Sequence, residues 1–203
     1  MVFILTKLLY QGHSSFRITS KEGLVIYIDP YAGRGYDLPA DLILVTHQHQ
    51  DHNQIKLVQL KSDGKVIQNF DLHPIDGSYL SSEFKGIKVT AVPAYNKNHP
   101  KEHGVGYIIF VDEFVLYHSG DTSYIAEMMD LASYDIDYAL LCGDGKYNMS
   151  IKESASCAEI IGAKHNVPIH LAPGELFDSL LASLWKAPNK KIIEPGVEIL
   201  LKK

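Results

Sequence analysis

The sequence predicts an α/β fold in which two mixed β-sheets are flanked by helices. Strand-like apolar runs dominate the first half of the chain, whereas strand-like and helix-like segments alternate in the second half, a pattern typical of sheets covered by helices. Polar residues repeatedly follow the apolar runs, which indicates that one sheet edge gathers the chemistry. No repeat, low-complexity tract or linker interrupts the chain, so we expect residues 1–203 to form a single domain.

Apolar runs separated by turn residues predict the strands of the first half, because β-branched and aromatic residues recur within them. The expected strands cover residues 3–9, 15–19, 24–28 and 42–45. A short helix is expected over residues 53–60, where one apolar face can be drawn and where Asp63-Gly64 ends the pattern. Strands over residues 65–67 and 87–92 follow.

In the second half, a hairpin is expected to join strands 105–111 and 114–117 across Asp112-Glu113. A helix over 123–132 and a strand over 136–142 come next. Ser150 and Glu153 have the spacing of a capping box, which predicts a helix that begins there and runs to about residue 165. The expected elements then end with a strand over 167–170, a helix over 175–185 and a strand over 197–201.

The composition is that of an ordinary soluble globular protein, with 46% hydrophobic residues, 21% charged residues and a net charge of −5. This charge argues against a broad basic surface, so we expect a small-molecule substrate and no nucleic acid partner. No apolar run approaches the roughly twenty residues of a membrane span, and residues 1–8 lack signal-peptide features. We therefore expect a cytoplasmic protein without a membrane partner; the sequence leaves homo-oligomerisation open.

The most informative stretch is residues 46–52, which places three histidines and an aspartate directly after the apolar run 41–45. Packing explains such density poorly, because a buried histidine needs a hydrogen-bond partner and gains little from clustering with others. Neutral imidazoles and a carboxylate are the ligands that zinc and other late first-row ions prefer. The alternative is a polar loop with locally bonded histidines, which the position after a buried strand disfavours.

Further motifs accompany this stretch over nearly the whole chain. They are Gly12-His13-Ser14-Ser15-Phe16, Ile28-Asp29-Pro30, Val92-Pro93-Ala94-Tyr95-Asn96, His99-Pro100-Lys101, Gly104-Val105-Gly106-Tyr107, Ser119-Gly120-Asp121-Thr122 and Pro168-Ile169-His170. Together they resemble the metal-dependent hydrolases of the metallo-β-lactamase fold, in particular the subgroup related to the ascorbate-6-phosphate lactonases. The resemblance implies a four-layer αββα sandwich that carries two divalent metal ions, zinc being favoured over manganese or iron.

The resemblance also implies roles for the residues of the 46–52 stretch. His47 and His49 correspond to ligands of a first metal ion, and Asp51 and His52 to ligands of a second. A hydroxide held between two such ions attacks a carbonyl or phosphorus centre, which the ions polarise. The implied activity is hydrolysis of a small, anionic ester, lactone or phosphoester.

The remaining implied ligands come from later loops. Asp121 corresponds to the carboxylate that bridges both ions, and His170 to the last ligand of the second site. The third histidine of the first site comes from the loop after Val92, where His99 is preferred and His103 is the alternative. Asp51 and Asp121 are thus the expected catalytic carboxylates.

Other residues are candidates for supporting roles around the metal ions. Asp29 is expected either to orient a ligand histidine or to cap the turn at Pro30, and His13 either to lie beneath the site or to pack. Candidates for substrate contact lie on the loops expected around the metals, namely Tyr95, Asn96, Lys101, Tyr147 and Asn148. Two other functions stay open: a nuclease or phosphodiesterase of the same fold, and a non-catalytic module that binds a metal or ligand.

Overall fold

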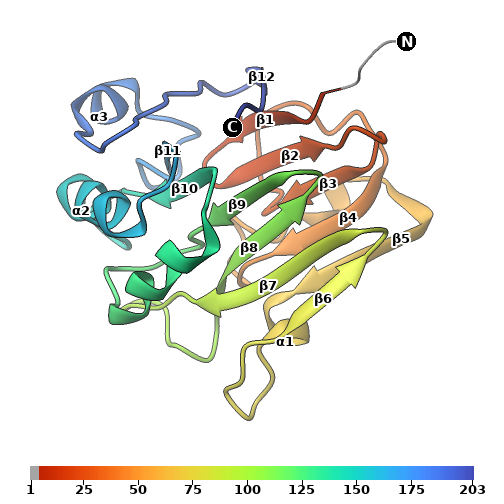
Figure 1. Ribbon diagram of the computed structural model, residues 1–203, viewed down its shortest axis with the longest axis horizontal. Helices are drawn as coiled ribbons and strands as arrows, with labels where there is room; N and C mark the ends of the chain where they lie inside the picture. The colour runs from red at the N-terminus through yellow and green to blue at the C-terminus, as the bar shows by residue number, and fades with distance from the viewer. Residues whose placement is uncertain (1–4) are drawn as a thin grey trace.

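Two six-stranded β-sheets pack face to face in the computed structural model, which describes residues 5–203 (Figure 1). The first sheet has the strand order β12-β1-β2-β3-β4-β5, and the second has the order β11-β10-β9-β8-β7-β6. Each sheet is mixed: the pairs β3–β4, β4–β5, β9–β10 and β10–β11 are parallel, and the others are antiparallel. This architecture confirms the predicted fold class.

The first sheet is built from both ends of the chain. Its strands are β1 (Lys7–Gly12), β2 (Ser15–Thr19), β3 (Val25–Ile28), β4 (Ala40–Val45), β5 (Leu60–Gln68) and β12 (Glu198–Leu200). The predicted strand 3–9 begins within residues 1–4, which lie outside the described residues. The terminal strand β12 pairs antiparallel with β1, so the predicted closing strand completes this sheet.

The predicted helix over residues 53–60 is wrong. The chain forms only a short 3-10 turn, η1 (Ile55–Leu57), and then enters β5. In β5, Val66 and Ile67 pair parallel with Ile43 and Leu44 of β4. Backbone pairing with β4 outweighs the weak intrinsic preference of a short segment for the helix.

The second sheet contains β6 (Ser81–Phe84), β7 (Ile87–Pro93), β8 (Val105–Val111), β9 (Phe114–His118), β10 (Tyr138–Cys142) and β11 (His165–Ile169). The predicted hairpin is present, with Val111 opposite Phe114. Strand β6 was not predicted, because its sequence, Ser-Ser-Glu-Phe, is mostly polar. Such a sequence suits its place at the edge of the sheet, where β7 is its only neighbour.

The main core lies between the two sheets. The first sheet contributes the alternate residues Leu8, Tyr10, Leu42 and Leu44, and the second contributes Tyr107 together with further residues of its strands. Strands β3 and β4 are buried on both faces, which explains their continuous apolar sequences. The outer face of these strands packs on a smaller cluster supplied by the segment before β4 and by η1, in place of a long helix; its members include Tyr36, Leu38, Ile55 and Val58.

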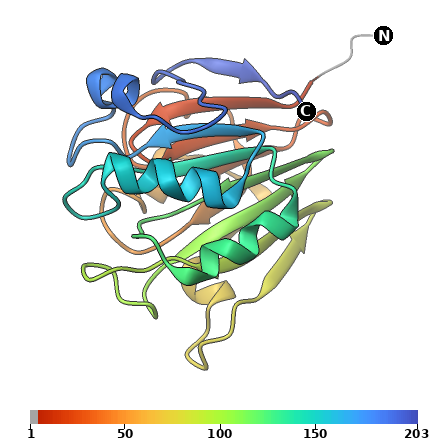
Figure 2. The ribbon, with the colours of Figure 1, turned by 60° about the vertical axis from the view of Figure 1, so that its left-hand side comes forward.

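Helices cover the outer face of the second sheet (Figure 2). They are α2 (Ile151–Ile161) and the 3-10 helix η2 (Ala126–Tyr134). Ser150 and Glu153 form the predicted capping box, but α2 ends at Gly162, whose left-handed backbone terminates it before β11 begins. Two shorter helices complete the described chain: α1 (Asn69–Leu72) and α3 (Ser179–Leu184). Within residues 5–203, no helix has the length and apolar character to cross a membrane.

A buried carboxylate at the start of β4 ties the two sheets together. Asp41 accepts hydrogen bonds from the Val25 amide at 2.9 Å, from Lys61 Nζ at 2.6 Å and from Lys85 Nζ at 2.9 Å. Lys85 belongs to the β6–β7 turn of the second sheet. Desolvation alone would raise the pKa of Asp41, but the two lysines outweigh it and the pKa is lowered.

Asp41→Asn is expected to lower the free energy of unfolding by about 1–3 kcal/mol near neutral pH, because two lysines lose their charged acceptor. The lowered pKa means that the carboxylate stabilises the fold above the unfolded value of about 3.9 and that this contribution is lost as pH falls through the folded pKa. Urea unfolding across the acidic range measures the effect. Asp63→Asn is the matched control, because the exposed Asp63 also pairs with Lys85, at 2.8 Å. An equal loss in both variants would contradict the role given to Asp41.

Candidate metal centre

Loops from five places in the chain bring histidines and carboxylates together at one edge of the two sheets. His13 lies in the β1–β2 turn, residues 47–52 follow β4, His99 lies in the β7–β8 loop, Asp121 follows β9 and His170 follows β11. Three groups of ligand-type atoms within 4.8 Å of one another result. They are His47, His49 and His99; His13, Asp51, His52 and His170; and His47, His52 and Asp121. Every predicted metal ligand is therefore in the cluster, and their binding of metal stays a prediction.

Asp121 lies at the centre of the cluster. Its Oδ2 is 3.3 Å from His99 Nε2, 3.5 Å from His170 Nε2 and 4.0 Å from His47 Nε2, and its Oδ1 is 3.4 Å from His52 Nε2. Burial alone would raise the pKa of Asp121, but the surrounding imidazoles hold it well below its usual range. The side chain is therefore an ionised carboxylate whose two oxygens face different histidines.

The turn before Asp121 requires glycine. Gly120 has a φ of +57°, and a Cβ at this position would lie 2.6 Å from the Val105 carbonyl oxygen. A larger residue would therefore push the Ser119-Gly120-Asp121 segment away from the β8 strand.

Asp29 anchors the first pair of histidines. Its Oδ2 accepts hydrogen bonds from His52 Nδ1 at 2.7 Å and from Thr46 Oγ1 at 2.6 Å, while Oδ1 accepts the Thr46 amide at 2.7 Å. Thr46 Oγ1 in turn lies 3.1 Å from His47 Nδ1. Because each Nδ1 is thus engaged, the Nε2 atoms of His47 and His52 face the cluster. This contact matches the orienting role, one of the two considered for Asp29.

A second chain of contacts connects the outer sides of His99 and His170. His99 Nδ1 lies 3.1 Å from Asn96 Oδ1, and Asn96 Nδ2 donates to Asn148 Oδ1 at 3.2 Å. Asn148 Nδ2 then donates to Asp144 Oδ2 at 2.8 Å, and that oxygen lies 3.2 Å from His170 Nδ1. Asp144 Oδ1 also accepts amides of its own loop, including that of Lys146 at 2.7 Å. One hydrogen-bonded chain therefore runs from His99 to Asp144, whose carboxylate lies beside the outer nitrogen of His170.

The pKa values of the buried histidines shift in opposite directions: those of His47 and His52 are lowered, and that of His170 is raised. Burial, together with neighbouring imidazoles, lowers the pKa of His47 and of His52 to about 3, so both are neutral near pH 7. Burial also opposes charge on His170, but the carboxylates of Asp121 and Asp144 outweigh it and raise its pKa to about 9. The centre therefore combines neutral imidazoles with ionised carboxylates, the protonation states that metal binding requires for most of its ligands.

The unpaired atoms of the cluster fit a divalent cation. The Nε2 atoms of His47, His52 and His170 and Oδ1 of Asp121 are buried and have no hydrogen-bond partner among residues 5–203. Each unpaired buried polar atom costs roughly 1–3 kcal/mol. Imidazole nitrogens and carboxylate oxygens that converge in this way suit zinc, manganese or iron, and coordination would satisfy all four atoms.

Two cavities adjoin the cluster. One has a volume of about 310 Å³ and extends from His47 and His99 past Gln48, Asn69 and His103. The other, of about 340 Å³, extends from His170 and Asp51 to Asn98 and Tyr147. His49 and Asp121 line both cavities, so a molecule in either could reach the same group of ligand-type atoms.

The substrate-contact candidates separate into three sets. Tyr147 lines the second cavity, whereas Asn96 and Asn148 belong to the network behind His99 and His170. Tyr95 and Lys101 both bond to Glu127 and line neither cavity. The alternative ligand His103 is exposed and lies outside the three ligand groups, although it lines the first cavity.

Two residues of the site were not among the predicted ligands or supporting carboxylates. His13 had been left open between packing and a place beneath the site, and the structure puts it against Asp51. Asp144 was overlooked, although it follows the apolar strand β10 just as Asp121 follows β9. The repeated pattern of polar residues after a buried strand was the signal that could have found it.

Comparisons with known proteins found a matching family model, similar sequences and similar folds. The model of the beta-lactamase superfamily domain matches residues 7–170. A UPF0173 metal-dependent hydrolase from Pyrococcus horikoshii is 30% identical, with 97% of this chain and 100% of the relative covered. Another such hydrolase, from Thermococcus onnurineus, is 29% identical, with 82% of this chain and 84% of the relative covered. The solved structure of Igni18, a metallo hydrolase from Ignicoccus hospitalis, matches this chain with a TM-score of 0.74 at 24% identity. The match covers 98% of this chain and 99% of Igni18, and it shows that the two folds are alike.

Asp144→Asn is expected to weaken metal binding about 10- to 100-fold, because an amide group replaces the carboxylate that faces His170 Nδ1. The asparagine oxygen can still accept the amides of the 144–148 loop, so the fold is expected to persist. Zinc titration of the metal-free protein measures the affinity, and circular dichroism checks the fold. Unchanged affinity in a folded variant would show that His170 needs no anchoring by Asp144.

Proposed function

This chain belongs to the beta-lactamase superfamily and is a metal-dependent hydrolase, and we propose that its cluster holds two divalent ions for the hydrolysis of a small ester, lactone or phosphoester. Zinc is the favoured ion, with manganese or iron as alternatives. When bound, the ions supply Lewis acidity, which lowers the pKa of water to roughly 7 and polarises the group under attack. The side chains of the centre would hold the ions and position the substrate.

The observation that carries the proposal is the position of Asp121 between two sets of imidazoles. Its Oδ2 faces His47 and His99 of one set and His170 of the other, and its Oδ1 faces His52, all within 4.0 Å. A carboxylate has the two oxygens needed to span ions about 3.5–4 Å apart. We assign His47, His49 and His99 to the first ion and Asp51, His52 and His170 to the second, with Asp121 shared.

Asp51 differs from Asp121 in its access to solvent. Its side chain is 36% exposed and lines the second cavity, so it can meet both a metal ion and the attacking water. Partial burial would raise the pKa of Asp51, but the close contact with His13 and the nearby imidazoles hold it well below the usual range. Asp51 therefore offers an ionised oxygen at the cavity wall, and it is the second catalytic carboxylate of the proposal.

The cavities support a small substrate. Among the described residues that line the two cavities, none is a lysine or an arginine. An anionic ester or phosphoester group therefore depends on the ions for its positive partner, while Gln48, Asn69 and Tyr147 offer neutral polar contacts to the rest of the molecule. A nuclease needs cations along the path of the phosphate backbone, so the small-molecule reading is the better supported.

Replacement of either His52 or Asp121 by alanine is expected to abolish binding of the second metal equivalent and all hydrolysis, because His52 is a proposed ligand of the second ion and Asp121 is the proposed ligand of both. Elemental analysis gives the metal content, and a screen of lactones, phosphodiesters and acyl esters after zinc or manganese loading gives the activity. The wild-type protein is expected to hold about two equivalents and to turn over one substrate class. Both metals retained in either variant would rule out the ligand assignment, and no turnover by the metal-loaded wild type would favour a binding module.

The pair His99→Asn and His103→Asn tests the third ligand of the first site. His99→Asn is expected to lose one metal equivalent, because it removes an imidazole that faces Asp121. His103→Asn is expected to keep both, since its side chain lies outside the ligand groups. Elemental analysis of the two variants after identical zinc loading and dialysis decides between them, and the reverse result would transfer the assignment to His103.

A further inference from the structure

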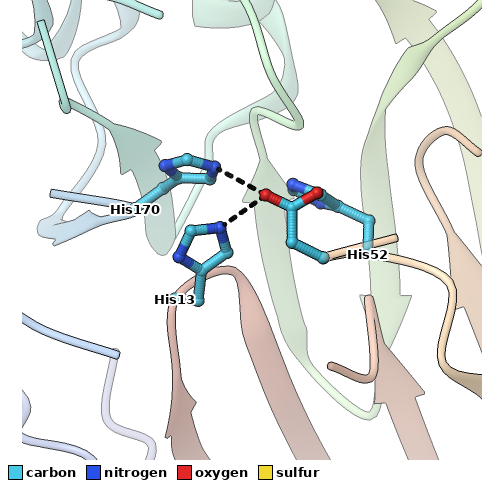
Figure 3. A group of neighbouring side chains, drawn as sticks. His13, His52 and His170 are labelled. Carbon is cyan, nitrogen blue, oxygen red and sulfur yellow. Dashed lines mark hydrogen bonds and ion pairs between the residues drawn. The ribbon is translucent and has the colours of Figure 1, made fainter. Parts of the chain in front are cut away.

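His13 lies inside the cluster, although the proposed ligand set does not use it. It is fully buried in the turn between β1 and β2, and its ring centroid is 3.7 Å from that of His170. Figure 3 shows the rings of His13 and His170 side by side, with that of His52 opposite them. The ligand-type atoms of His13, Asp51, His52 and His170 all lie within 4.8 Å of one another.

The two ring nitrogens of His13 face incompatible partners for a neutral imidazole. Nδ1 lies 3.0 Å from the Glu175 carbonyl oxygen, which can only accept a hydrogen bond, so Nδ1 carries the proton. The neutral ring then presents a lone pair at Nε2, and Nε2 lies 3.1 Å from Oδ2 of Asp51, which is also an acceptor. A cation between these two atoms removes the conflict.

The backbone is strained at both histidines that meet here. His13 has a φ of 57° and His170 a φ of 48°, in the left-handed region that few non-glycine residues adopt, although histidine is enriched there together with asparagine and aspartate. The His170 amide donates to the His13 carbonyl oxygen at 2.9 Å, and the His13 amide donates to the Leu176 carbonyl oxygen at 2.6 Å. Such strain persists where surrounding contacts hold it, and it concentrates at functional sites.

We infer that His13 is a further ligand of the second metal ion, through Nε2, alongside Asp51, His52 and His170. His13 Nε2 lies 3.1 Å from Asp51 Oδ2 and within 4.8 Å of the ligand-type atoms of His52 and His170, so these four residues would be able to hold one ion together. The inference rests on the proposed function, since it requires metal at this centre. It gives the second ion three imidazoles and a carboxylate from this chain, besides its share of Asp121.

The competing explanation is that a proton lies between the two atoms and that His13 only holds Asp51 in position. Two amide substitutions separate the explanations. His13→Gln places an amide donor near the position of Nε2 and so can keep the hydrogen bond to Asp51, but it supplies no imidazole. His13→Asn tolerates the left-handed backbone and keeps a donor near Nδ1, but it leaves nothing at Nε2.

The experiment compares zinc affinity and X-ray absorption spectra of the wild type, His13→Gln, His13→Asn and the exposed control His103→Asn. We expect both His13 variants to bind the second zinc at least about 100-fold more weakly, with fewer imidazoles per zinc at matched loading, and the control to match the wild type. Unfolding midpoints measured without metal confirm that each variant folds. Wild-type affinity and imidazole count in His13→Gln would overturn the inference and leave His13 as a positioning residue. Failure of the wild type to bind two ions would instead overturn the proposed function.

Discussion

The buried carboxylate of Asp121, with four imidazoles within 4.0 Å, is the constraint on which the rest of the site depends. Imidazoles packed this closely repel one another when charged, and burial adds to the cost of charge. His47 and His52 therefore stay neutral near pH 7, and their Nε2 lone pairs point inward without a partner. The unpaired Nε2 atoms lower the free energy of unfolding relative to an ordinary apolar core. A bound cation would satisfy these atoms.

Residues around the cluster contact the outer sides of the histidine rings and so help to hold the rings in place. Asp29 holds His52, Asn96 holds His99, and Asp144 faces His170. These anchors come from segments far apart in the sequence, yet the sheets bring them to one edge. Parallel pairing of β3 with β4 and of β10 with both β9 and β11 places several strand ends together, and each of those ends is followed by a residue of the site.

Local sequence signals predicted most of this arrangement. Continuous apolar runs identified the doubly buried strands β3 and β4, and the Ser150–Glu153 spacing identified the start of α2. The same signals failed where tertiary contacts outweighed them. The 53–60 segment has an apolar face suited to a helix, yet pairing with β4 draws the following residues into β5. The polar β6 has no strand signal of its own and is held by β7.

The sequence by itself determined which residue types supply the centre, because the composition and spacing of the 46–52 segment, together with Asp121 and His170, predict metal ligands. Only the tertiary structure placed His99 rather than His103 beside Asp121, and only the structure set His13 against Asp51 and Asp144 against His170. The physical reason is that a lone histidine or aspartate on a loop has no local pattern that reveals its partner. Its role depends on which strand ends the two sheets bring together and on the contacts that fix each ring nitrogen.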